Sequence, residues 1–460
     1  MKLELKDKQV LVLGLGDTGL SALRWLHRQG ARLSVADTRE TPPGVATLQA
    51  ELPSVKLHTG AFTEVVFNDA EIIVISPGVP IAEPMVKAAV KRGVHVVGDI
   101  ELFAQYKPES AKVIAITGTN GKSTVTTLVG EICKAAGLKT VVAGNIGLPV
   151  LDTLNGDIPD VYVLELSSFQ LETTSSLNAD VATVLNISED HMDRYEGLDD
   201  YAQAKTRVFF GKGVQVLNRQ DAWSMSMVLQ GRTVVTFGLD AAANDNDFGL
   251  ATQAKDTQLM RGRKALMAAS EMKIAGLHNT ANALAAMALC EAIGVPQAGM
   301  IKALREYKGL PHRVEWVADI GNVAFYDDSK GTNVGATCAA LQGLVSPNGA
   351  KKIVLIAGGD GKGQDFSPLA DIVAKDARAV VLLGRDAPQI ETALSGTKVD
   401  LIKVESLEAA VKTAFGLAKA GDAVLLSPAC ASFDMFRNYV HRAEVFVQSV
   451  KALATERAPA

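Results

Sequence analysis

The chain has 460 residues, of which 48% are hydrophobic and 21% are charged, and its formal net charge is −5. This composition excludes an intrinsically disordered chain, and at about 150 residues per domain the length predicts about three domains. The mildly acidic balance contains no long run of one sign and argues against a nucleic-acid surface, for which a basic stripe is expected.

The beginning of the chain, "MKLELKDKQVLVLG", leads into a strand without the long apolar core of a signal peptide. No apolar run approaches the ~20 residues of a membrane span. The four cysteines lie far apart and form no C-x-x-C pair, so neither a disulfide framework nor a zinc site is expected. We therefore expect a cytoplasmic protein that contacts neither membrane nor nucleic acid.

The first hundred residues alternate short apolar runs with amphipathic stretches, which predicts a parallel sheet covered by helices. Strands are expected at 9–16, 32–38, 71–78 and 94–99. The first ends in Gly14, Gly16 and Gly19, a G-x-G-x-x-G spacing that predicts a tight turn and a pyrophosphate at a helix N-terminus. Asp37 ends the next strand, where a dinucleotide-binding fold places its ribose-binding acid. One interpretation is therefore a nicotinamide oxidoreductase.

A polar stretch near residue 100 predicts a domain boundary, after which the strand and loop "VIAITGTNGKST" predict a second phosphate site. The backbone N–H groups of such a loop and the dipole of the helix that follows attract phosphate oxygens. Lys122 would reach the outer phosphates, and Ser123 or Thr124 would hold Mg²⁺. The loop departs from the usual spacing, because Ile116 occupies the place of the earlier glycine.

Further strands of this second set are expected at 140–145, 161–168, 181–187, 214–219 and 233–238, with a loop and weak edge strands over 242–258. A helix is expected from Asn279 to Gly294. Glu165 closes one strand, His191 lies in a polar loop, and Lys205 lies in a helical stretch. Together these residues suit a metal and triphosphate site, although each taken singly suits an ordinary structural or surface role.

A third set of strands is expected at 323–328, 352–359, 379–384 and 423–429. Arg313, where the second set gives way to the third, is placed to reach a γ-phosphate when domains close. The loops 326–333, 357–366 and 426–436 follow strands, and ligands bind at the carboxyl ends of strands in open α/β sheets. We predict domains at 1–99, 100–309 and 310–460, with a substrate pocket in the last.

Taken together, the motifs resemble those of the Mur ligases, in the order in which that family has them. The stretches that carry the resemblance are "GLGDTGLS", "ADTR", "SPGV", "TGTNGKST", "GNIG", "ELSSFQL", "NISEDHMDRY", "HN" at 278, "LPHR", "DDSKGTN", "GGDGKG" and "SPACASFDMF". The resemblance implies an α/β protein with three domains: an N-terminal Rossmann-like domain for a UDP-sugar, a central P-loop ATPase-like parallel sheet, and a C-terminal Rossmann-like domain for an amino acid. The first glycine turn then holds a nucleotide sugar and not a nicotinamide cofactor.

The resemblance also implies an activity: ATP phosphorylates the carboxylate of UDP-N-acetylmuramoyl-L-alanine, D-glutamate attacks the acyl phosphate, and ADP and phosphate leave. Residues that match UDP-sugar contacts of the family are Gly14, Leu15, Gly16, Asp17, Thr18, Asp37, Thr38, Arg39, Ser76, Pro77, Gly78, Asn145, Ser167 and Gln170. Residues that match ATP contacts are Gly118, Thr119, Asn120, Gly121, Lys122, Ser123, Thr124, Asn282, Arg313 and Asp328.

For catalysis the resemblance implicates Lys122, Glu165, His191, Lys205 and Lys330. Ser123 and Glu165 would serve one Mg²⁺ and His191 a second, and Lys205 matches a lysine that becomes carbamylated and so supports the metal. Positions that match D-glutamate contacts are Thr332, Lys362, Ser432, Phe433 and Tyr439. Tyr439 is a departure, since the family pattern has phenylalanine there; the ring is kept and a hydroxyl is added.

Three alternatives stay open at this point. Another member of the ligase superfamily would add L-alanine, a diamino acid, or glutamate on folate, although the start "GLGDTGLS" and the loops "DDSKGTN" and "SPACASFDMF" favour D-glutamate. A nicotinamide oxidoreductase would leave "TGTNGKST" and the third set of strands unexplained. A non-catalytic nucleotide-binding module would not require Lys122, Glu165, His191 and Lys205 together. We expect a monomer that uses ATP and two Mg²⁺ ions.

Overall fold

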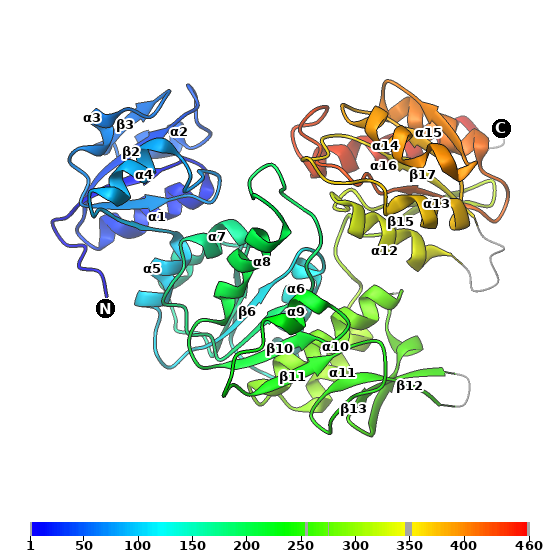
Figure 1. Cartoon of the computed structure of the whole chain (residues 1–460), viewed down its shortest axis with the longest axis horizontal. Helices are drawn as coiled ribbons and strands as arrows, with labels where there is room; N and C mark the ends of the chain where they lie inside the picture. The colour runs from blue at the N-terminus through cyan, green and yellow to red at the C-terminus, as the bar shows by residue number, and fades with distance from the viewer. Residues whose placement is uncertain (1, 254–255, 275, 346–351, 458–460) are drawn as a thin grey trace. The chain divides into compact units, whose positions relative to one another are not determined.

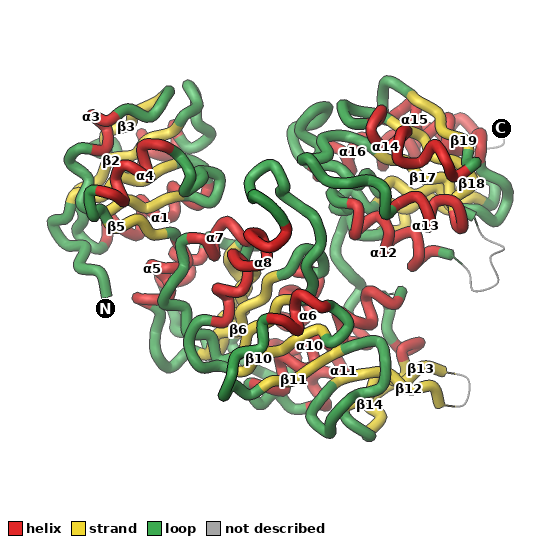
Figure 2. The backbone as a smooth tube through the Cα atoms, in the orientation of Figure 1, coloured by secondary structure: helices red, strands yellow, loops and turns green. Residues whose placement is uncertain are grey.

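A computed structural model describes residues 2–253, 256–274, 276–345 and 352–457 of the chain (Figure 1). The described chain is of mixed α/β type, and its strands form three separate sheets (Figure 2). It divides into two compact units. The first comprises 1–187, 199–269 and 282–305, and the second comprises 188–198, 270–281 and 306–460. The α/β fold with three sheets confirms the fold class predicted from the sequence.

The first sheet is parallel and has the strand order β3-β2-β1-β4-β5. Its elements are β1 Gln9–Leu13, α1 Asp17–Arg28, β2 Arg32–Asp37, α2 Val45–Glu51, β3 Lys56–Thr59, α3 Glu64–Phe67, β4 Ile72–Ile75, α4 Pro84–Lys91 and β5 His95–Val97. The strand order reverses between β1 and β4, so the loops after these two strands flank a crevice at the carboxyl edge of the sheet. The first glycine turn and Ser76–Gly78 lie in those two loops.

The second sheet has the order β14-β13-β12-β11-β10-β9-β6-β8-β7 and is parallel from β12 to β7. Its first elements are α5 Asp99–Tyr106, β6 Lys112–Thr117, α6 Lys122–Ala135, β7 Thr140–Gly144, η1 Val150–Leu154, β8 Val161–Glu165, α7 Ser168–Glu172, β9 Val181–Val184, α8 Leu198–Thr206 and η2 Arg207–Phe209. Those that follow are β10 Val214–Asn218, α9 Ala222–Ser226, β11 Val234–Phe237, β12 Phe248–Gln253, β13 Asp256–Arg261, β14 Lys264–Ala268, η3 Ala269–Glu271, α10 Leu277–Ala292 and α11 Gln297–Glu306. The run Val113–Ile116 of β6 is fully buried, as a strand with neighbours on both sides requires.

Two segments of this region differ from the sequence prediction. The stretch 242–258, expected to be a loop with weak edge strands, holds most of an antiparallel pair, β12 and β13, which β14 extends; residues 254 and 255 lie outside the described part. The segment near residue 100, where the sequence predicts a domain boundary, also forms a helix that was not predicted, α5, of which the first five residues are buried. The polar composition of this segment hid the helix, because Asp99 and Glu101 are buried and do not lie on the surface.

The third sheet has the order β15-β16-β20-β17-β18-β19 and is parallel apart from β15. Its elements are β15 Glu315–Ile320, β16 Val323–Asp327, α12 Val334–Leu344, β17 Ile353–Ala357, α13 Leu369–Asp376, β18 Ala377–Leu382, α14 Ala387–Leu394, η4 Ser395–Thr397, β19 Asp400–Lys403, α15 Leu407–Leu417, β20 Ala423–Leu426 and α16 Tyr439–Arg457. Alternate residues of β17 face opposite sides. Ile353 and Leu355 pack with α12, α13 and α14, whereas Val354 and Ile356 pack with α15 and α16.

The strands β3, β15 and β19 were not predicted. All three lie at the edge of a sheet, where a strand pairs on one side only and is half-buried. Their sequences, such as "KLHT", therefore lack the apolar runs that identify the central strands. Among the described helices, none combines the length and the apolar character needed to cross a membrane.

Candidate functional site

The turn after β1 requires glycine at two of its three glycine positions, Gly14 and Gly19, and is open at the third, Gly16. Gly14 has a φ of +91°, a left-handed conformation that favours glycine. A Cβ on Gly19 would lie 1.9 Å from the Gly14 carbonyl oxygen, so α1 can pack against the turn only without a side chain there. A Cβ on Gly16, the N-cap of α1, would meet nothing within 4 Å, which leaves that backbone open on one side. The turn thus presents bare backbone at a helix N-terminus, where anions bind.

This turn borders a pocket of about 730 Å³, a volume typical of small-molecule sites. Its lining comprises Gly14, Gly16, Asp17, Thr18, Asp37, Thr38, Arg39, Ser76, Pro77, Gly78, Val79, Gly144, Asn145, Ile146, Gly147, Pro149 and Gln170. Every UDP-sugar candidate except Leu15 and Ser167 is among these residues. The loop after β7 forms the other wall, of which only Asn145 was predicted. The signal for this wall was its two glycines, Gly144 and Gly147, which both have a positive φ.

Asp37 is committed to contacts within the protein. Its Oδ2 accepts the Leu15 N–H at 2.7 Å and the Arg39 Nη2–H at 2.6 Å. Its Oδ1 accepts the Arg39 backbone N–H at 2.9 Å and Nε–H at 2.8 Å. Burial raises the pKa of Asp37, but the hydrogen bonds from Arg39 and Leu15 outweigh burial and lower the pKa to about 2. Asp37 therefore fixes the glycine turn and the arginine that lines the pocket.

The lysine loop, residues 118–121, lies at the carboxyl end of β6 and is held by the segment that follows the neighbouring strand β9. The Thr119 N–H donates to the Asn186 carbonyl at 2.9 Å, and the Asn120 N–H donates to Asn186 Oδ1 at 2.8 Å. Lys122 opens α6, and its Nζ donates to the carbonyls of Gly118 and Thr119 at 2.8 and 2.7 Å. The ammonium group thus lies over its own loop, where a phosphate acceptor can replace the two carbonyls.

Two more candidates from the sequence, Asn282 and Lys205, lie around this loop. A Cβ on Gly121 would approach Asn282 Oδ1 to 2.6 Å, so the Asn282 amide of α10 touches the loop directly. Lys205 on α8 is only 1% exposed, and its Nζ donates to Thr117 Oγ1 at 3.4 Å at the end of β6. The same Nζ lies 4.5 Å from the centre of the Tyr201 ring. A lysine buried at this point is held there by packing against the loop and is not a solvated helix residue.

Glu165 ends β8 and is paired in register with Ile116, just before the lysine loop. Its side chain is buried, and Asn145 Nδ2 donates to its Oε1 at 2.6 Å. Its Oε2 is buried and has no hydrogen-bond partner within the described residues. A buried carboxylate oxygen that has no hydrogen-bond partner is expected to contact a bound ligand, such as a metal ion. Ser123 and Thr124, both buried in the first turn of α6, add oxygen donors of the kind Mg²⁺ prefers, so these residues fit a magnesium site.

The remaining candidates belong to the second unit, where two of them are linked by an acid. Lys362 has a φ of +53°, and its Nζ forms an ion pair with Asp190 Oδ1. Asp190 Oδ2 lies 3.7 Å from His191 Nε2 and accepts from Asn333 Nδ2 at 3.5 Å. The loop 188–198, which carries His191, is therefore tied to the loops predicted to hold the amino acid. Asp190 was not predicted, because one acid in a polar loop carries no distinguishing pattern.

Asp328 follows β16 and is fully enclosed. Ser427 Oγ donates to its Oδ2 at 2.6 Å, and the Val314 N–H donates to its Oδ1 at 3.3 Å. Burial raises the pKa of Asp328 to about 7, although the Ser427 hydrogen bond and the charge of Arg313 oppose the shift. Arg313 and Asp328 are thus electrostatically coupled, and the structure places these two ATP candidates in one region.

The amino-acid candidates cluster only in part. Lys330 Nζ lies 4.0 Å from the centre of the Tyr439 ring, and the Thr332 N–H donates to the Lys330 carbonyl at 2.9 Å. Ser432 is buried, whereas the neighbouring Phe433 is 74% exposed. The Phe433 side chain therefore lies in solvent and is not packed into the second unit.

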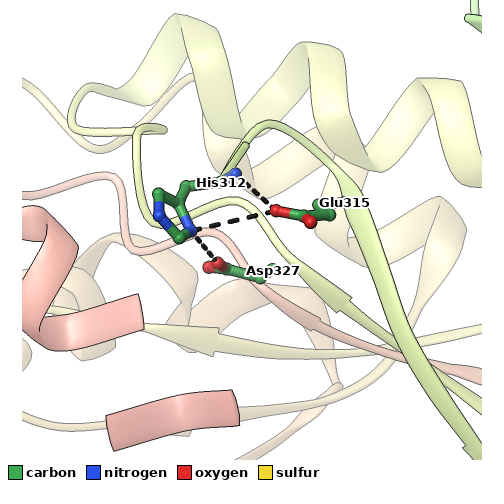
Figure 3. Close-up of side chains that lie close together, drawn as sticks. All are labelled: His312, Glu315 and Asp327. Carbon is green, nitrogen blue, oxygen red and sulfur yellow. Dashed lines mark hydrogen bonds and ion pairs between the residues drawn. The ribbon is translucent and has the colours of Figure 1, made fainter. Parts of the chain in front are cut away.

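Figure 3 shows a cluster of His312, Glu315 and Asp327. The centre of the His312 ring lies 6.2 Å from the centre of the Tyr439 ring. His312 Nδ1 lies 2.7 Å from Asp327 Oδ2 and 3.9 Å from Glu315 Oε2 (Figure 3). The other Asp327 oxygen accepts from Ser329 N–H and Oγ at 2.9 and 2.6 Å. A separation of 2.7 Å is that of a hydrogen bond, so the carboxylate fixes the orientation of the imidazole ring.

Arg442 is another feature that sequence reasoning missed. It is 2% exposed on α16, and its guanidinium donates to the carbonyls of Ser329 and Cys430 at 2.8 and 3.2 Å. Burial lowers the pKa of Arg442 to about 10. The arginine thereby ties together the loops after β16 and β20. A single arginine within a helix has no sequence signature for this role.

Comparison with known proteins places these features in a family. Three family descriptions match the chain in order: Mur ligase MurD-like N-terminal domain over 8–98, Mur ligase middle domain over 116–290, and Mur ligase glutamate ligase domain over 312–430. The chain is 65% identical to a UDP-N-acetylmuramoylalanine–D-glutamate ligase of Methylobacillus flagellatus, with 98% of each chain covered. It is 56% identical to the protein of the same name from Thiobacillus denitrificans, covering 99% of this chain and 98% of the relative.

Solved structures agree on the fold. The UDP-N-acetylmuramate–alanine ligase MurC of Thermotoga maritima superposes with a TM-score of 0.61 at 20% identity, covering 97% of this chain and 99% of the other. A pseudomurein peptide ligase type C of Methanothermus fervidus gives 0.61 at 19% identity, covering 97% and 100%. At such identities these two structures speak for the fold alone.

Proposed function

The chain belongs to the Mur ligase family, and on this premise we propose that it adds D-glutamate to UDP-N-acetylmuramoyl-L-alanine in the synthesis of peptidoglycan precursors. In this reaction ATP phosphorylates the free carboxylate of the UDP-sugar. The amine of D-glutamate then attacks the acyl phosphate, and ADP and phosphate are released. Full-length relatives of 65% and 56% identity that bear the name of this activity support the proposal.

One structural observation carries the proposal: the first unit holds two separate turns of the kind that suits a phosphate group, each at a helix N-terminus. The turn after β1 opens on a 730 Å³ pocket, and the loop after β6 carries Lys122 at the start of α6. A reaction between a uridylated sugar and ATP needs two nucleotide sites of this kind. An oxidoreductase with one dinucleotide would need only the first.

The UDP-sugar pocket has groups suited to each part of that substrate. Gly14, Gly16, Asp17 and Thr18 lie at the start of α1, where backbone N–H groups and the helix dipole attract the pyrophosphate. The loops after β2 and β4, with Thr38, Arg39, Ser76, Pro77 and Gly78, are left for the uracil and ribose. On the facing wall, Asn145 and Gln170 offer amides to the rest of the sugar.

Bringing the substrate carboxylate to the triphosphate sets two anions against each other. At an effective dielectric near 20, two unit charges about 4 Å apart interact by about 4 kcal/mol. Lys122 supplies one compensating cation at the outer phosphates, and Asn282 is placed to contact the nucleotide at the same loop. From the second unit, Arg313 and Asp328 are the proposed further ATP contacts.

The family uses ATP and Mg²⁺, and this chain has residues that suit the metal. Ser123 and Glu165 would hold one ion, which neutralises phosphate charge, and His191 would serve a second. Lys205 would support the metal if its amine is carbamylated, because carbamylation replaces a cation with an anion. Its burial beside Thr117 at the end of β6 places the amine at the lysine loop, which supports this proposal.

For D-glutamate we propose Thr332, Lys362, Ser432, Phe433 and Tyr439. Lys362 and Asp190 form a largely buried ion pair whose charges balance. In the proposal, a carboxylate of the substrate replaces the Asp190 carboxylate as the partner of Lys362. Lys330, beside the Tyr439 ring, would assist near the acyl phosphate. We further propose that the protein acts as a cytoplasmic monomer, and that its partners are small-molecule substrates only.

The test is release of phosphate from ATP by the purified protein with a panel of amino acids. Release is expected only when Mg²⁺, UDP-N-acetylmuramoyl-L-alanine and D-glutamate are present together. Equal release with L-glutamate would refute the stereospecificity. Release with L-alanine and the unextended UDP-sugar, with a diamino acid, or with folate and glutamate would assign the chain to another branch of the superfamily.

A further inference from the structure

Asp99 is a buried acid beside the UDP-sugar pocket that has no role in the reaction described so far. It is the first residue of α5, directly after β5 and Gly98. Its side chain is only 3% exposed, and its Oδ1 is buried with no hydrogen-bond partner within the described residues. Its Oδ2 accepts from Gln170 Nε2 at 3.4 Å. Because an unsatisfied buried carboxylate is costly, it calls for an explanation.

Gln170 connects Asp99 to the pocket. It is 3% exposed, lines the pocket, and stands at the third position of α7. Its Oε1 accepts the Ser167 backbone N–H at 3.2 Å, while Ser167 Oγ accepts the Gln170 backbone N–H at 3.2 Å. These two contacts form a capping box. A backbone N–H can only donate, so Oε1 of the Gln170 amide is fixed on the Ser167 side.

The same reasoning fixes the other end of the amide. Nε2 of Gln170 carries two N–H groups, and an ionised carboxylate can only accept. Asp99 Oδ2 therefore receives one N–H, and the second N–H is left for an acceptor in the pocket. A flipped amide would set its oxygen against the Asp99 carboxylate and its N–H groups against the Ser167 N–H. Asp99 and Ser167 together thus allow one orientation of Gln170.

Asp99 is also held rigidly enough to orient another group. A Cβ on Gly98 would lie 2.3 Å from Thr173 Oγ1, so the chain before α5 packs directly against the end of α7. Burial raises the pKa of Asp99 to about 6, although the Ile100 N–H and the Gln170 amide favour the charged form. The chain keeps a poorly solvated acid here, which points to a role beyond packing.

We propose that Asp99 is a positioning residue for the UDP-sugar: it orients the Gln170 amide so that one N–H faces an acceptor oxygen of the bound substrate. Asp99 itself touches no substrate. This inference rests on the proposed function, because the ligand of the pocket is taken to be UDP-N-acetylmuramoyl-L-alanine.

The experiment measures kcat and the KM of each substrate for Asp99→Ala, Asp99→Asn and Gln170→Ala, together with the wild type. Asp99→Ala is expected to raise the KM of the UDP-sugar about tenfold, the effect of one lost orienting hydrogen bond. The kcat at saturating UDP-sugar and the KM values of ATP and D-glutamate stay within twofold. Asp99→Asn, which keeps an acceptor oxygen, is expected to recover most of the affinity. The double variant Asp99→Ala/Gln170→Ala is expected to be no weaker than Gln170→Ala alone.

Glu101→Gln is the matched control. Glu101 is a buried acid on the same helix, where it accepts the N–H groups of Ser175 and Ser176 at 2.6 and 2.9 Å, and it does not line the pocket. This variant is expected to lower the melting temperature without changing any KM. An unchanged UDP-sugar KM in folded Asp99→Ala, or fully additive effects in the double variant, would overturn the inference. If the wild type neither binds nor converts the UDP-sugar, the proposed function itself fails, and the two failures are thus distinguishable.

Discussion

Replacing Asp37 by asparagine tests how the first glycine turn is held in place. The carboxylate accepts four N–H groups, three from Arg39 and one from the buried Leu15 backbone. Asparagine keeps one acceptor oxygen and presents an NH₂ group to donors on the other side. The difference between the ordinary pKa of 3.8 and the pKa of about 2 corresponds to about 2 kcal/mol of stability at neutral pH. An independent estimate agrees, since an unsatisfied buried N–H costs about 1–3 kcal/mol.

Hydrogen exchange followed by mass spectrometry reads this effect locally, in the peptides 11–20 and 32–40. A loss of about 2 kcal/mol in local stability speeds exchange at the Leu15 amide about 30-fold. Peptides of the central sheet are expected to be unchanged. Glu71→Gln is the control in the same sheet, because Glu71 also accepts a backbone N–H, from Gln9, but is exposed and should change exchange less.

The pH dependence of this contribution has a definite sign. A folded-state pKa below the unfolded value gives stability that is complete above about pH 4 and is lost as the pH falls through about 2. The wild type should therefore lose stability in the first sheet over that range, and Asp37→Asn should not. Equal exchange in wild type and variant at neutral pH would refute the account of the turn.

Three other predictions concern the buried charges. Glu165→Gln is expected to lower kcat by about 100-fold or more and to raise the Mg²⁺ requirement. It should not lower the melting temperature, because Oε2 has no partner to lose among the described residues; normal turnover at the same Mg²⁺ would contradict this. Burial raises the pKa of Asp328 to about 7, so its contribution to stability falls as the pH rises from about 4 to 7. Asp328→Asn should therefore raise the melting temperature of the second unit at pH 8 but not at pH 4. A higher melting temperature of the variant at pH 4 and not at pH 8 would contradict the effect assigned to burial. The wild type should lose activity in carbon dioxide-free buffer and regain it when bicarbonate is added, whereas Lys205→Arg should not respond to bicarbonate. Equal responses of the two proteins would count against carbamylation of Lys205.

The fold followed from the sequence wherever strands are central and apolar. Val10–Leu13 and Val113–Ile116 are buried runs that end at glycine turns, so their position and their ligand-binding edge were predictable. Edge strands such as β3 and β15 were not, because half-burial leaves no clear alternation. The helix α5 was missed for another reason: its acidic residues are buried, although its composition resembles that of an exposed linker.

The candidate site shows the same division. Glycines and strand ends identified most of the pocket lining, because backbone geometry restricts which residue fits. Partnerships between side chains far apart in sequence, such as Lys362 with Asp190 or Arg442 with the Ser329 carbonyl, depend on tertiary packing and leave no local pattern. Sequence reasoning assigned Asp37 to the ribose, which stays a prediction: Asp37 lines the pocket, and its contacts with Leu15 and Arg39 could not be predicted.

The central claim is that the turn after β1 binds the UDP-sugar and the loop of Lys122 binds ATP, as two independent sites. Titration calorimetry of Lys122→Ala with UDP-N-acetylmuramoyl-L-alanine tests it directly, with ATP titrated in parallel. The account predicts that the variant binds the UDP-sugar with the dissociation constant of the wild type, but that it binds no ATP and has no turnover. Loss of UDP-sugar binding in this variant would contradict it.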